Sequence, residues 1–258
     1  MDIHDRIAPS ILQNRLALVT GAGQGNGAAI ARGLARAGAS VIVTDIKAET
    51  ASRTAAEIEH AGGRAWSYTL DVASSAVCVE LAARTARDAG RIDLLVNNAG
   101  ILIREGVDHP QAVANLQRTL EVNVQGTFNV THAWLADLRA TRGAIVNVAS
   151  IAAFAGHQGM VGYSPSKGAI KMLTQTLAGE LAVDGIRVNA IAPGVIATAM
   201  SATTRANPER LARFMQRIPL ARVAEPEELI GPVVFLASDM ASYITGVTLP
   251  VDGGFLAI

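Results

Sequence analysis

Tyr163 and Lys167 are four residues apart and could act together as an acid–base pair. On a helix this spacing puts both side chains on one face. A free phenol titrates near pH 10, which is too high for an efficient base at neutrality, but a neighbouring ammonium lowers that pKa. A fall of about three pH units requires about 4 kcal/mol, which a charge pair shielded from water can supply. Tyr163 could then take a proton from an alcohol during oxidation, or return one during reduction.

Ser150 lies 13 residues before Tyr163 and could hydrogen-bond the oxygen of such a substrate. Each of these residues also has an ordinary structural interpretation. A Tyr/Lys pair at this spacing is commonly part of a helix surface, and a serine at the end of a strand is commonly a cap. Found together at these spacings, the three side chains favour a catalytic site over three separate structural roles.

A glycine-rich segment near the N-terminus, TGAGQGNG at residues 20–27, could bind a dinucleotide. Gly21, Gly25 and Gly27 allow a tight turn and a close approach to a pyrophosphate, whose charge the N-terminus of a following helix stabilises. Such a segment alone is weak evidence, because a plain turn between a strand and a helix can look the same. Its place between the first predicted strand and the first predicted helix strengthens the interpretation.

Asp45 ends the second predicted strand, 24 residues after Gly21. An acidic side chain at this point can hydrogen-bond both hydroxyls of an adenosine ribose, whereas its charge would repel a 2′-phosphate. The nearest cation is Lys47, and none lies within the glycine loop. The sequence therefore favours NAD over NADP, with a helix-capping role for Asp45 as the alternative.

The elements that must position these residues follow a regular alternation of short apolar runs and Ala-rich helical segments. The predicted strands are residues 16–20, 41–45, 66–72, 93–99, 144–150, 186–192 and 246–252. Near-continuous apolar strands separated by helices predict a parallel sheet covered on both faces. We therefore expect one doubly wound, Rossmann-type α/β domain of about seven strands over residues 1–258, with 1–14 as an N-terminal extension. The irregular section 195–220 has its own helix start at Asn207-Pro208-Glu209 and is expected to cover the substrate as a lid.

Composition limits the class of protein. With 258 residues, half of them hydrophobic and only 17% charged, the chain can bury a large core. The 22 basic and 22 acidic residues cancel, so nothing favours nucleic acid as a partner. The longest stretch without a charged residue, 143–166, is too polar and glycine-rich for a membrane span, and the N-terminus lacks the apolar segment of a signal peptide. The single cysteine, Cys78, cannot form an internal disulfide, so we expect a packed thiol and a cytoplasmic location.

The motifs and their order resemble the single-domain branch of the short-chain dehydrogenase/reductase family. That family has a glycine loop of the form TGxxxGxG, matched by residues 20–27, and an NNAG segment, matched by residues 97–100. PGVIAT at residues 193–198 matches the segment that contacts the nicotinamide amide, and ITGVTLPVDGG matches the usual ending. The resemblance covers residues 12–258, with the motifs in order.

The resemblance implies roles for individual residues. Ser150, Tyr163 and Lys167 match the catalytic set, Lys167 would also hold the nicotinamide ribose, and Asn123 would hold a water in a proton path. Asp71 matches an adenine-contacting aspartate, although capping is a serious alternative. The predicted cofactor contacts are Gly21, Gln24, Gly25, Asn26, Gly27, Asp45, Asp71, Val72, Asn98, Ala99, Gly100, Tyr163, Lys167, Pro193, Gly194, Ile196 and Thr198.

Two residues depart from the family pattern. Asn26 stands where a branched apolar residue is usual, and its amide could reach the diphosphate or the nicotinamide ribose, or cap the helix. Pro165 lies two residues after Tyr163 and would remove a helix hydrogen bond unless the helix begins near Gly162. Proline is tolerated in a first turn, so we expect the Tyr/Lys geometry to survive.

These features predict an NAD(H)-dependent oxidoreductase that interconverts a secondary alcohol, such as a polyol, sugar-derived or hydroxy compound, and a ketone by hydride transfer. An NADPH-dependent reductase of the 3-oxoacyl-thioester type is one alternative, and Asp45 argues against it. A non-catalytic sensor that binds NAD without turnover is another, and the intact Ser/Tyr/Lys set argues against that.

The expected pocket walls are residues 101–104, 152–162 and 195–220. They mix apolar groups with Arg104 and His157, which suits a polyol, a sugar-derived alcohol, a steroid or an acyl ketone. His157 has no second ligand at metal spacing, so no metal site is expected. The family usually forms homotetramers through its two long helices and C-terminal strand, and the same assembly is expected here.

Overall fold

Seven parallel strands form one sheet in the order β3-β2-β1-β4-β5-β6-β7. The computed structural model describes residues 10–258. The strands are β1 (Leu16–Val19), β2 (Ser40–Asp45), β3 (Ala65–Thr69), β4 (Leu94–Asn97), β5 (Ala144–Val148), β6 (Arg187–Pro193) and β7 (Thr248–Val251). The chain order reverses at β1, which has β2 on one side and β4 on the other. Such a reversal opens a crevice beyond the carboxyl ends of the strands.

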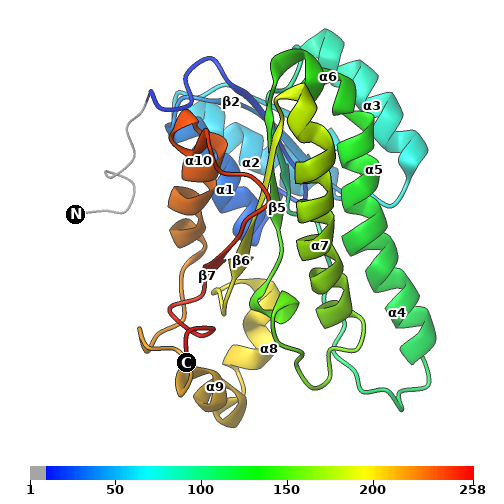
Figure 1. Cartoon of the computed structure of the whole chain (residues 1–258), viewed down its shortest axis with the longest axis vertical. Helices are drawn as coiled ribbons and strands as arrows, with labels where there is room; N and C mark the ends of the chain where they lie inside the picture. Colours follow the sequence, from blue (N-terminus) through cyan, green and yellow to red (C-terminus); the bar gives the residue numbers. More distant parts are fainter. Residues whose placement is uncertain (1–9) are drawn as a thin grey trace.

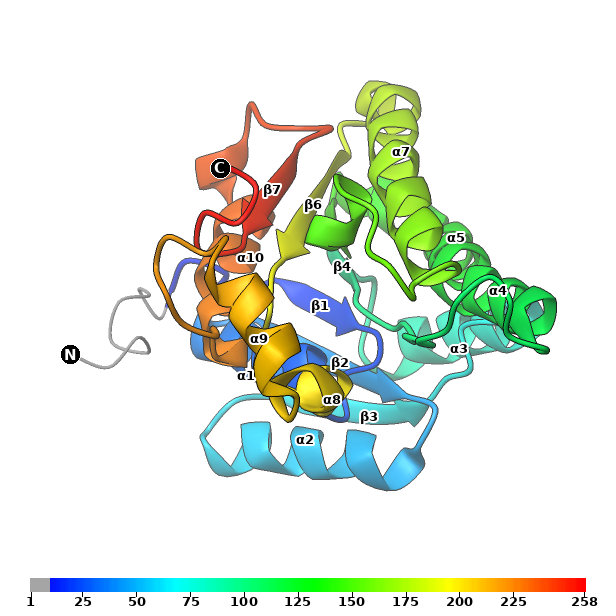
Figure 2. The ribbon, with the colours of Figure 1, turned by 90° about the horizontal axis from the view of Figure 1, so that it is seen from below.

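Helices cover both faces of the sheet (Figures 1 and 2). One face carries α1, α2 and α10, and the other carries α3, α4, α5 and α7. The helices are α1 (Gly25–Arg36), α2 (Ala48–His60), α3 (Ser75–Asp88), α4 (Ala112–Leu120), α5 (Gly126–Ala133), α6 (Leu135–Thr141), α7 (Tyr163–Leu181), α8 (Ala202–Arg205), α9 (Pro208–Met215) and α10 (Ile230–Ala237). A π-helical turn, Glu121–Gln125, joins α4 to α5.

The core has two layers because successive strand residues point to opposite faces of the sheet. Ala17 of β1 packs in the layer that contains Ile30 of α1 and Val233 of α10. Its neighbour Leu18 packs in the layer that contains Leu81 of α3 and Leu177 of α7. Both strand residues are fully buried, which explains why the strands are apolar throughout rather than alternating.

The doubly wound seven-stranded sheet predicted from the sequence is confirmed, with most strands slightly shorter than expected because their last residues leave the sheet. Within the predicted extension 1–14, residues 1–9 lie outside the described part, and Leu12 is buried with its N–H donating to the Ala37 carbonyl oxygen at 2.8 Å. The predicted helix start at Asn207 is confirmed, since its side chain caps α9. No helix within residues 10–258 is long and apolar enough to cross a membrane.

Candidate functional site

A cavity of about 420 Å³ opens at the carboxyl edge of the sheet. Its walls come from the segments that follow β1 to β6, together with the start of α7 and the region of α8 and α9. This edge is the lower end of the molecule in Figure 1, where α8 and α9 lie beyond the strands. The cavity therefore occupies the crevice that the reversal in strand order creates.

The glycine loop after β1 forms one wall. Gly21 and Gly25 have φ angles of +59° and +54°, a region that favours glycine. Gly27 has no room for a side chain, because a Cβ atom there would lie 2.3 Å from the Gly21 carbonyl oxygen and 2.4 Å from Asn98 Nδ2. Asn98 Nδ2 donates to the carbonyl oxygens of Thr20 and Gly21 at 2.9 and 3.0 Å. Gly27 thus acts by close packing rather than by lining the cavity, and the NNAG segment holds the loop in shape.

Asp45 joins the end of β2 to the glycine loop. Its carboxylate accepts hydrogen bonds from the backbone N–H groups of Gly23 at 2.9 Å and Lys47 at 3.0 Å. The N-cap residue of α2 is Lys47, and no side-chain hydrogen bond caps that helix. The helix-capping alternative is therefore wrong, and the carboxylate lines the cavity while it fixes the loop.

Tyr163 is the first residue of α7 and lines the cavity with Ser150. Burial raises the pKa of Tyr163, while the hydrogen bond with Ser150 and the positive charge of Arg104 lower it. We expected Lys167 to lower the pKa of Tyr163, but burial outweighs the lowering effects and the pKa is raised; the largest lowering effect is the hydrogen bond with Ser150, followed by the charge of Arg104. Pro165 falls in the first turn of α7, where the missing N–H is not required.

Lys167 lies one turn further along α7 and is 5% exposed. Its Nζ donates to the Val148 carbonyl oxygen at 2.7 Å and lies 5.7 Å from the centre of the Tyr163 ring. Burial lowers the pKa of Lys167 to about 8. The ammonium therefore lies in the cavity wall close to the phenol, which is the arrangement that their spacing predicts.

Asn123 lies in the π-helical turn and does not line the cavity. Its Oδ1 accepts from the Ile101 N–H at 2.8 Å, and its Nδ2 donates to the Ile101 carbonyl oxygen at 3.0 Å and to Ser166 Oγ at 2.9 Å. These bonds occupy both amide hydrogens, so the side chain ties the segment after β4 to α7. Asn97 Nδ2 donates to Thr131 Oγ1 and to Asn147 Oδ1, which ties β4 to α5 and β5.

Most of the predicted cofactor contacts meet at this one cavity. Those that line it are Gly21, Gln24, Gly25, Asn26, Asp45, Asp71, Val72, Asn98, Ala99, Gly100, Tyr163, Lys167, Pro193, Gly194, Ile196 and Thr198. The fit to a dinucleotide rests on the glycine loop, where only glycine leaves space at the helix start. No group of three or more His, Cys, Asp or Glu side chains that could hold a metal occurs in the described part of the chain.

Several residues around the nucleotide end carry no signal that the sequence alone reveals. A Cβ atom at Gly23 would lie 2.3 Å from Thr50 Oγ1 and 2.8 Å from Asp45 Oδ2, so this position also requires glycine. Arg53 of α2 donates to the Gly23 carbonyl oxygen at 3.2 Å. Arg118 of α4 also lines the cavity. Nothing in the local sequence marks either arginine, because Arg53 reaches the glycine loop from α2 and Arg118 reaches the cavity wall from α4.

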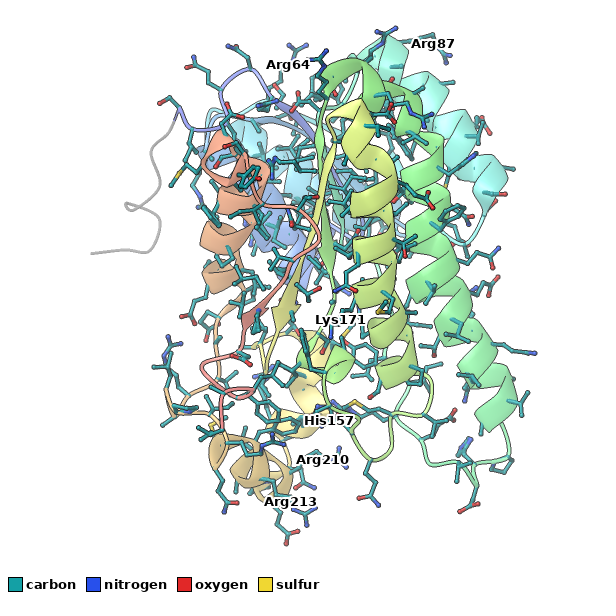
Figure 3. All side chains as sticks on the ribbon, in the orientation of Figure 1. Arg64, Arg87, His157, Lys171, Arg210 and Arg213 are labelled. Carbon is teal, nitrogen blue, oxygen red and sulfur yellow. The ribbon has the colours of Figure 1, made fainter. Side chains whose placement is uncertain are left out.

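Arg104 and His157 form the polar part of the opposite end of the cavity. Arg104 Nη2 donates to Thr204 Oγ1 at 2.7 Å, which links the segment after β4 to α8. Burial lowers the pKa of Arg104, and the charge of Arg210 lowers it further. Figure 3 places His157 and Arg210 at this same end of the molecule. The cavity thus ends in a region of positive charge.

His157 packs within an aromatic cluster that joins three parts of the chain. Its ring centre lies 5.7 Å from that of Phe214 in α9 and 6.0 Å from that of Phe255 near the C-terminus. Its Nε2 is buried without a hydrogen-bond partner within residues 10–258. Burial lowers the pKa of His157, followed by the charges of Arg217 and Arg104. A neutral imidazole therefore lines this end of the cavity, with its Nε2 enclosed by protein.

Comparisons with known proteins agree with this arrangement. Residues 21–256 match a family model described as enoyl-(acyl carrier protein) reductase. The 3-oxoacyl-[acyl-carrier-protein] reductase FabG of Thermotoga maritima is 39% identical over 252 residues, which are 95% of this chain and 99% of that protein. The 2-dehydro-3-deoxy-D-gluconate 5-dehydrogenase of Bacillus subtilis is 39% identical over 257 residues, 99% of this chain and 98% of that protein. One similar solved structure is a gluconate 5-dehydrogenase from Burkholderia cenocepacia J2315 in complex with NADP and tartrate. Its TM-score is 0.92 at 33% identity, and the match covers 97% of this chain and 98% of that one.

Proposed function

We propose that this chain, which belongs to the short-chain dehydrogenase/reductase family, interconverts a secondary alcohol and a ketone on a small polyhydroxy carboxylic acid. The reaction class is that of an NAD(P)-dependent oxidoreductase acting on an alcohol or keto group. The acidic substrate is the new part of the proposal, and it rests on Arg104.

Arg104 brings a positive charge into the cavity without a carboxylate to balance it. Within residues 10–258 its guanidinium has the Thr204 hydroxyl as a partner and forms no ion pair. A charge withdrawn from water is costly unless an opposite charge compensates it. Arg104 is also close enough to Tyr163 for each to shift the pKa of the other. A substrate carboxylate on Arg104 would therefore place the reacting carbon near the phenol.

His157 adds a polar ring to the wall at the same end of the cavity. The names of two similar proteins point to the same chemistry, since both act on gluconate-type acids, and the Burkholderia structure contains tartrate, a small hydroxy acid. In this chain, Arg104 is the residue that would bind the carboxylate of such an acid.

The catalytic residues follow from their positions around the cavity. When bound, a nicotinamide dinucleotide supplies the hydride acceptor or donor. Ser150 would hydrogen-bond the reacting oxygen, and Tyr163 would take its proton during oxidation or return it during reduction. Lys167 would hold the nicotinamide ribose, while the hydrogen bond with Ser150 and the charge of Arg104 would favour the ionised phenol. Asn123 would act as a positioning residue, because its bonds to Ile101 and Ser166 fix α7 against the segment after β4.

We also propose that NAD is preferred to NADP. The Asp45 carboxylate is held at the cavity wall by two backbone N–H groups, where it can bind ribose hydroxyls and repel a 2′-phosphate. The Burkholderia relative binds NADP, and Arg53 lies beside the glycine loop, so the preference needs a direct test. Calorimetric titration with NADH and NADPH should show tighter NADH binding, and Asp45→Asn should reduce the difference. Equal or tighter NADPH binding by the wild-type protein would refute the preference.

The test of the acidic substrate compares gluconate with a neutral polyol of the same carbon chain. We expect the wild-type protein to oxidise the acid with the higher kcat/KM. Arg104→Met should lower kcat/KM for the acid about 10- to 100-fold, since a hydrogen bond to a charged group contributes about 1.5–3 kcal/mol. Arg213→Met is the matched control, because it removes one positive charge from α9 without changing the cavity wall. A wild-type protein that uses the neutral polyol equally well would refute the proposal.

A second candidate function is the reduction of a 3-oxoacyl thioester with NADPH. The 39% identity to the Thermotoga reductase favours it. The two candidates are separated by assaying the wild-type and Arg104→Met proteins with an uncharged probe, the acetoacetyl thioester of N-acetylcysteamine. Efficient reduction of this probe with NADPH, together with no activity on hydroxy acids, would favour the thioester reductase.

Three further properties belong to this proposal. Residues 195–220 would act as a lid, since this segment carries Thr204 and Phe214 of the cavity wall. The chain would form homotetramers, in keeping with the exposed apolar side chains Val113 and Phe128 on α4 and α5, and light scattering at micromolar concentration tests this. A cytoplasmic location suits Cys78, which is buried in the core.

A further inference from the structure

The C-terminal segment after β7 turns back toward the substrate end of the cavity. In Figure 1 the C-terminus lies near α9, at the lower end of the molecule. The Asp252 carboxylate accepts hydrogen bonds from the backbone N–H groups of Gly254 at 2.9 Å and Leu256 at 3.0 Å. Gly253 and Gly254 have φ angles of +66° and +92°, which favour glycine. This turn directs Phe255 into the protein, where its side chain is only 2% exposed.

The same turn fits closely against residues 218–220, the end of the lid segment. A Cβ atom at Gly253 would lie 2.8 Å from Ile218 Cγ2, so the two segments are in contact. The Leu220 N–H donates to the Gly253 carbonyl oxygen at 3.2 Å. The turn after β7 therefore fixes the last residues of the lid, while α8 and α9 depend on other contacts.

Phe255 provides such a contact for α9. Its ring centre lies 5.8 Å from that of Phe214 in α9 and 6.0 Å from that of His157. The Arg217 guanidinium lies 4.2 Å from the centre of the same ring. Phe214 and His157 line the cavity, and Phe255 is buried behind them. Phe255 thus supports two residues of the cavity wall from outside the wall.

The aromatic cluster is the link between α9 and the loop after Ser150. Within residues 10–258 no hydrogen bond or ion pair joins residues 151–162 to residues 199–217. The bond between Arg104 and Thr204 holds α8 to the segment after β4 and leaves α9 to side-chain packing. Aromatic rings at these separations attract one another in addition to burying apolar area. Loss of the Phe255 ring should therefore loosen α9.

We propose that Phe255 is a positioning residue that holds α9 against the loop after Ser150 and so sets the shape of the substrate end of the cavity. The inference rests on the proposed lid and on the binding of substrate at this end. The glycine loop and Asp45, at the nucleotide end, make no ring contact with Phe255. A change at Phe255 should therefore alter substrate binding and leave dinucleotide binding nearly unchanged.

Limited trypsin digestion measures the opening of α9 without substrate or cofactor. Arg210 and Arg213 are exposed on α9, and cleavage after them requires local opening of the helix. Phe255→Leu keeps an apolar side chain but removes the ring contacts. It should raise the rate of cleavage at these two sites, followed by mass spectrometry, about five- to tenfold. Phe235→Leu is the matched control, since it makes the same substitution on α10, against the core layer beside α1, and should leave the rate within about twofold.

Phe214→Leu gives a second variant on the partly exposed side of the aromatic cluster, which keeps the test available if Phe255→Leu does not fold. This variant should raise the same cleavage rate. The double variant should be cleaved more slowly than the product of the two single effects predicts, because both substitutions break the same ring contact. A double effect equal to that product would mean that the rings act independently, which would overturn the proposal.

Steady-state kinetics with gluconate and NAD show whether the positioning reaches the substrate. Phe255→Leu should raise the KM for gluconate about three- to tenfold, while kcat and the NADH affinity measured by calorimetry stay within about twofold. A loss of folded enzyme would instead lower kcat and leave KM unchanged. An unchanged KM would overturn the proposal, as would cleavage of Phe255→Leu no faster than that of wild type or of Phe235→Leu. If the wild-type protein does not oxidise gluconate, the proposed function fails, and the cleavage rates still decide the role of Phe255.

Discussion

Burial of the Lys167 ammonium makes a quantitative prediction about the stability of the protein. The side chain is 5% exposed and donates to the Val148 carbonyl oxygen, and it forms no ion pair with any described carboxylate. Burial lowers its pKa from the ordinary value of 10.5 to about 8. The folded protein therefore holds this charge at a cost, and Lys167→Met removes that cost.

The size and sign of the effect follow from the two pKa values. Between about pH 8 and pH 10.5 the unfolded chain binds more protons at Lys167 than the folded protein does, so stability rises with pH in this window. At pH 7 the lysine is charged in both states, and the cost of burial is about 3 kcal/mol. At pH 9.5 the Lys167 side chain of the folded protein has released its proton, and about 1 kcal/mol of the burial cost remains. Wild type should thus gain about 2 kcal/mol relative to Lys167→Met between pH 7 and 9.5.

Urea unfolding of both proteins without cofactor, at equal protein concentration and at several pH values from 7 to 9.5, measures this gain. Comparison with the methionine variant cancels the titration of other groups that the two proteins share. Lys171→Met, one turn further along α7, controls for the loss of one ammonium from the same helix. A difference between wild type and Lys167→Met that stays constant with pH would refute the reasoning, because it would mean that folding does not change the protonation of Lys167.

Three other substitutions test the site and its scaffold. Tyr163→Phe should lower kcat by about 10²–10⁴ while NADH affinity measured by calorimetry stays within about twofold, and full activity would rule out Tyr163 as the acid–base group. Gly27→Ala should destabilise the protein by about 1–3 kcal/mol in urea and weaken NADH binding, because its Cβ would overlap the Gly21 carbonyl oxygen; wild-type stability would contradict the packing described here. Arg187→Met should cost about 2–3 kcal/mol in urea, since this half-buried guanidinium donates to the Leu236 carbonyl oxygen at 2.8 Å at the end of α10, and a loss below about 0.5 kcal/mol would show that the contact contributes little.

The fold and the nucleotide end could be predicted because their signals are local in sequence. A strand buried on both faces has an apolar run that is visible residue by residue, and all seven were found in this way. The φ angles of Gly21 and Gly25 and the packing of Gly27 are likewise properties of one short loop. For the same reason the Asn207 cap of α9 was recognised from three adjacent residues.

Contacts between distant segments could not be predicted in this way. Thr204 lies 100 residues after Arg104, and only the folded chain brings the two together. The pKa of Tyr163 depends on burial and on Arg104, neither of which the spacing to Lys167 reveals. The bonds of Asn123 show the same limit, since its position in a helix does not say whether the amide faces a cavity or ties two segments together.

The unsatisfied groups of the cavity connect these findings. Lys167 holds a buried charge, and Asn26 and His157 each hold a buried polar atom without a partner in the described chain. Each should lower the stability of the protein, because a buried charge or an unpaired buried polar atom costs free energy. Lys167→Met and Asn26→Leu should therefore each raise the free energy of unfolding, and their effects should add in the double variant, because each cost belongs to its own atom. A double variant no more stable than either single variant would instead mean that one shared structural change accounts for both effects.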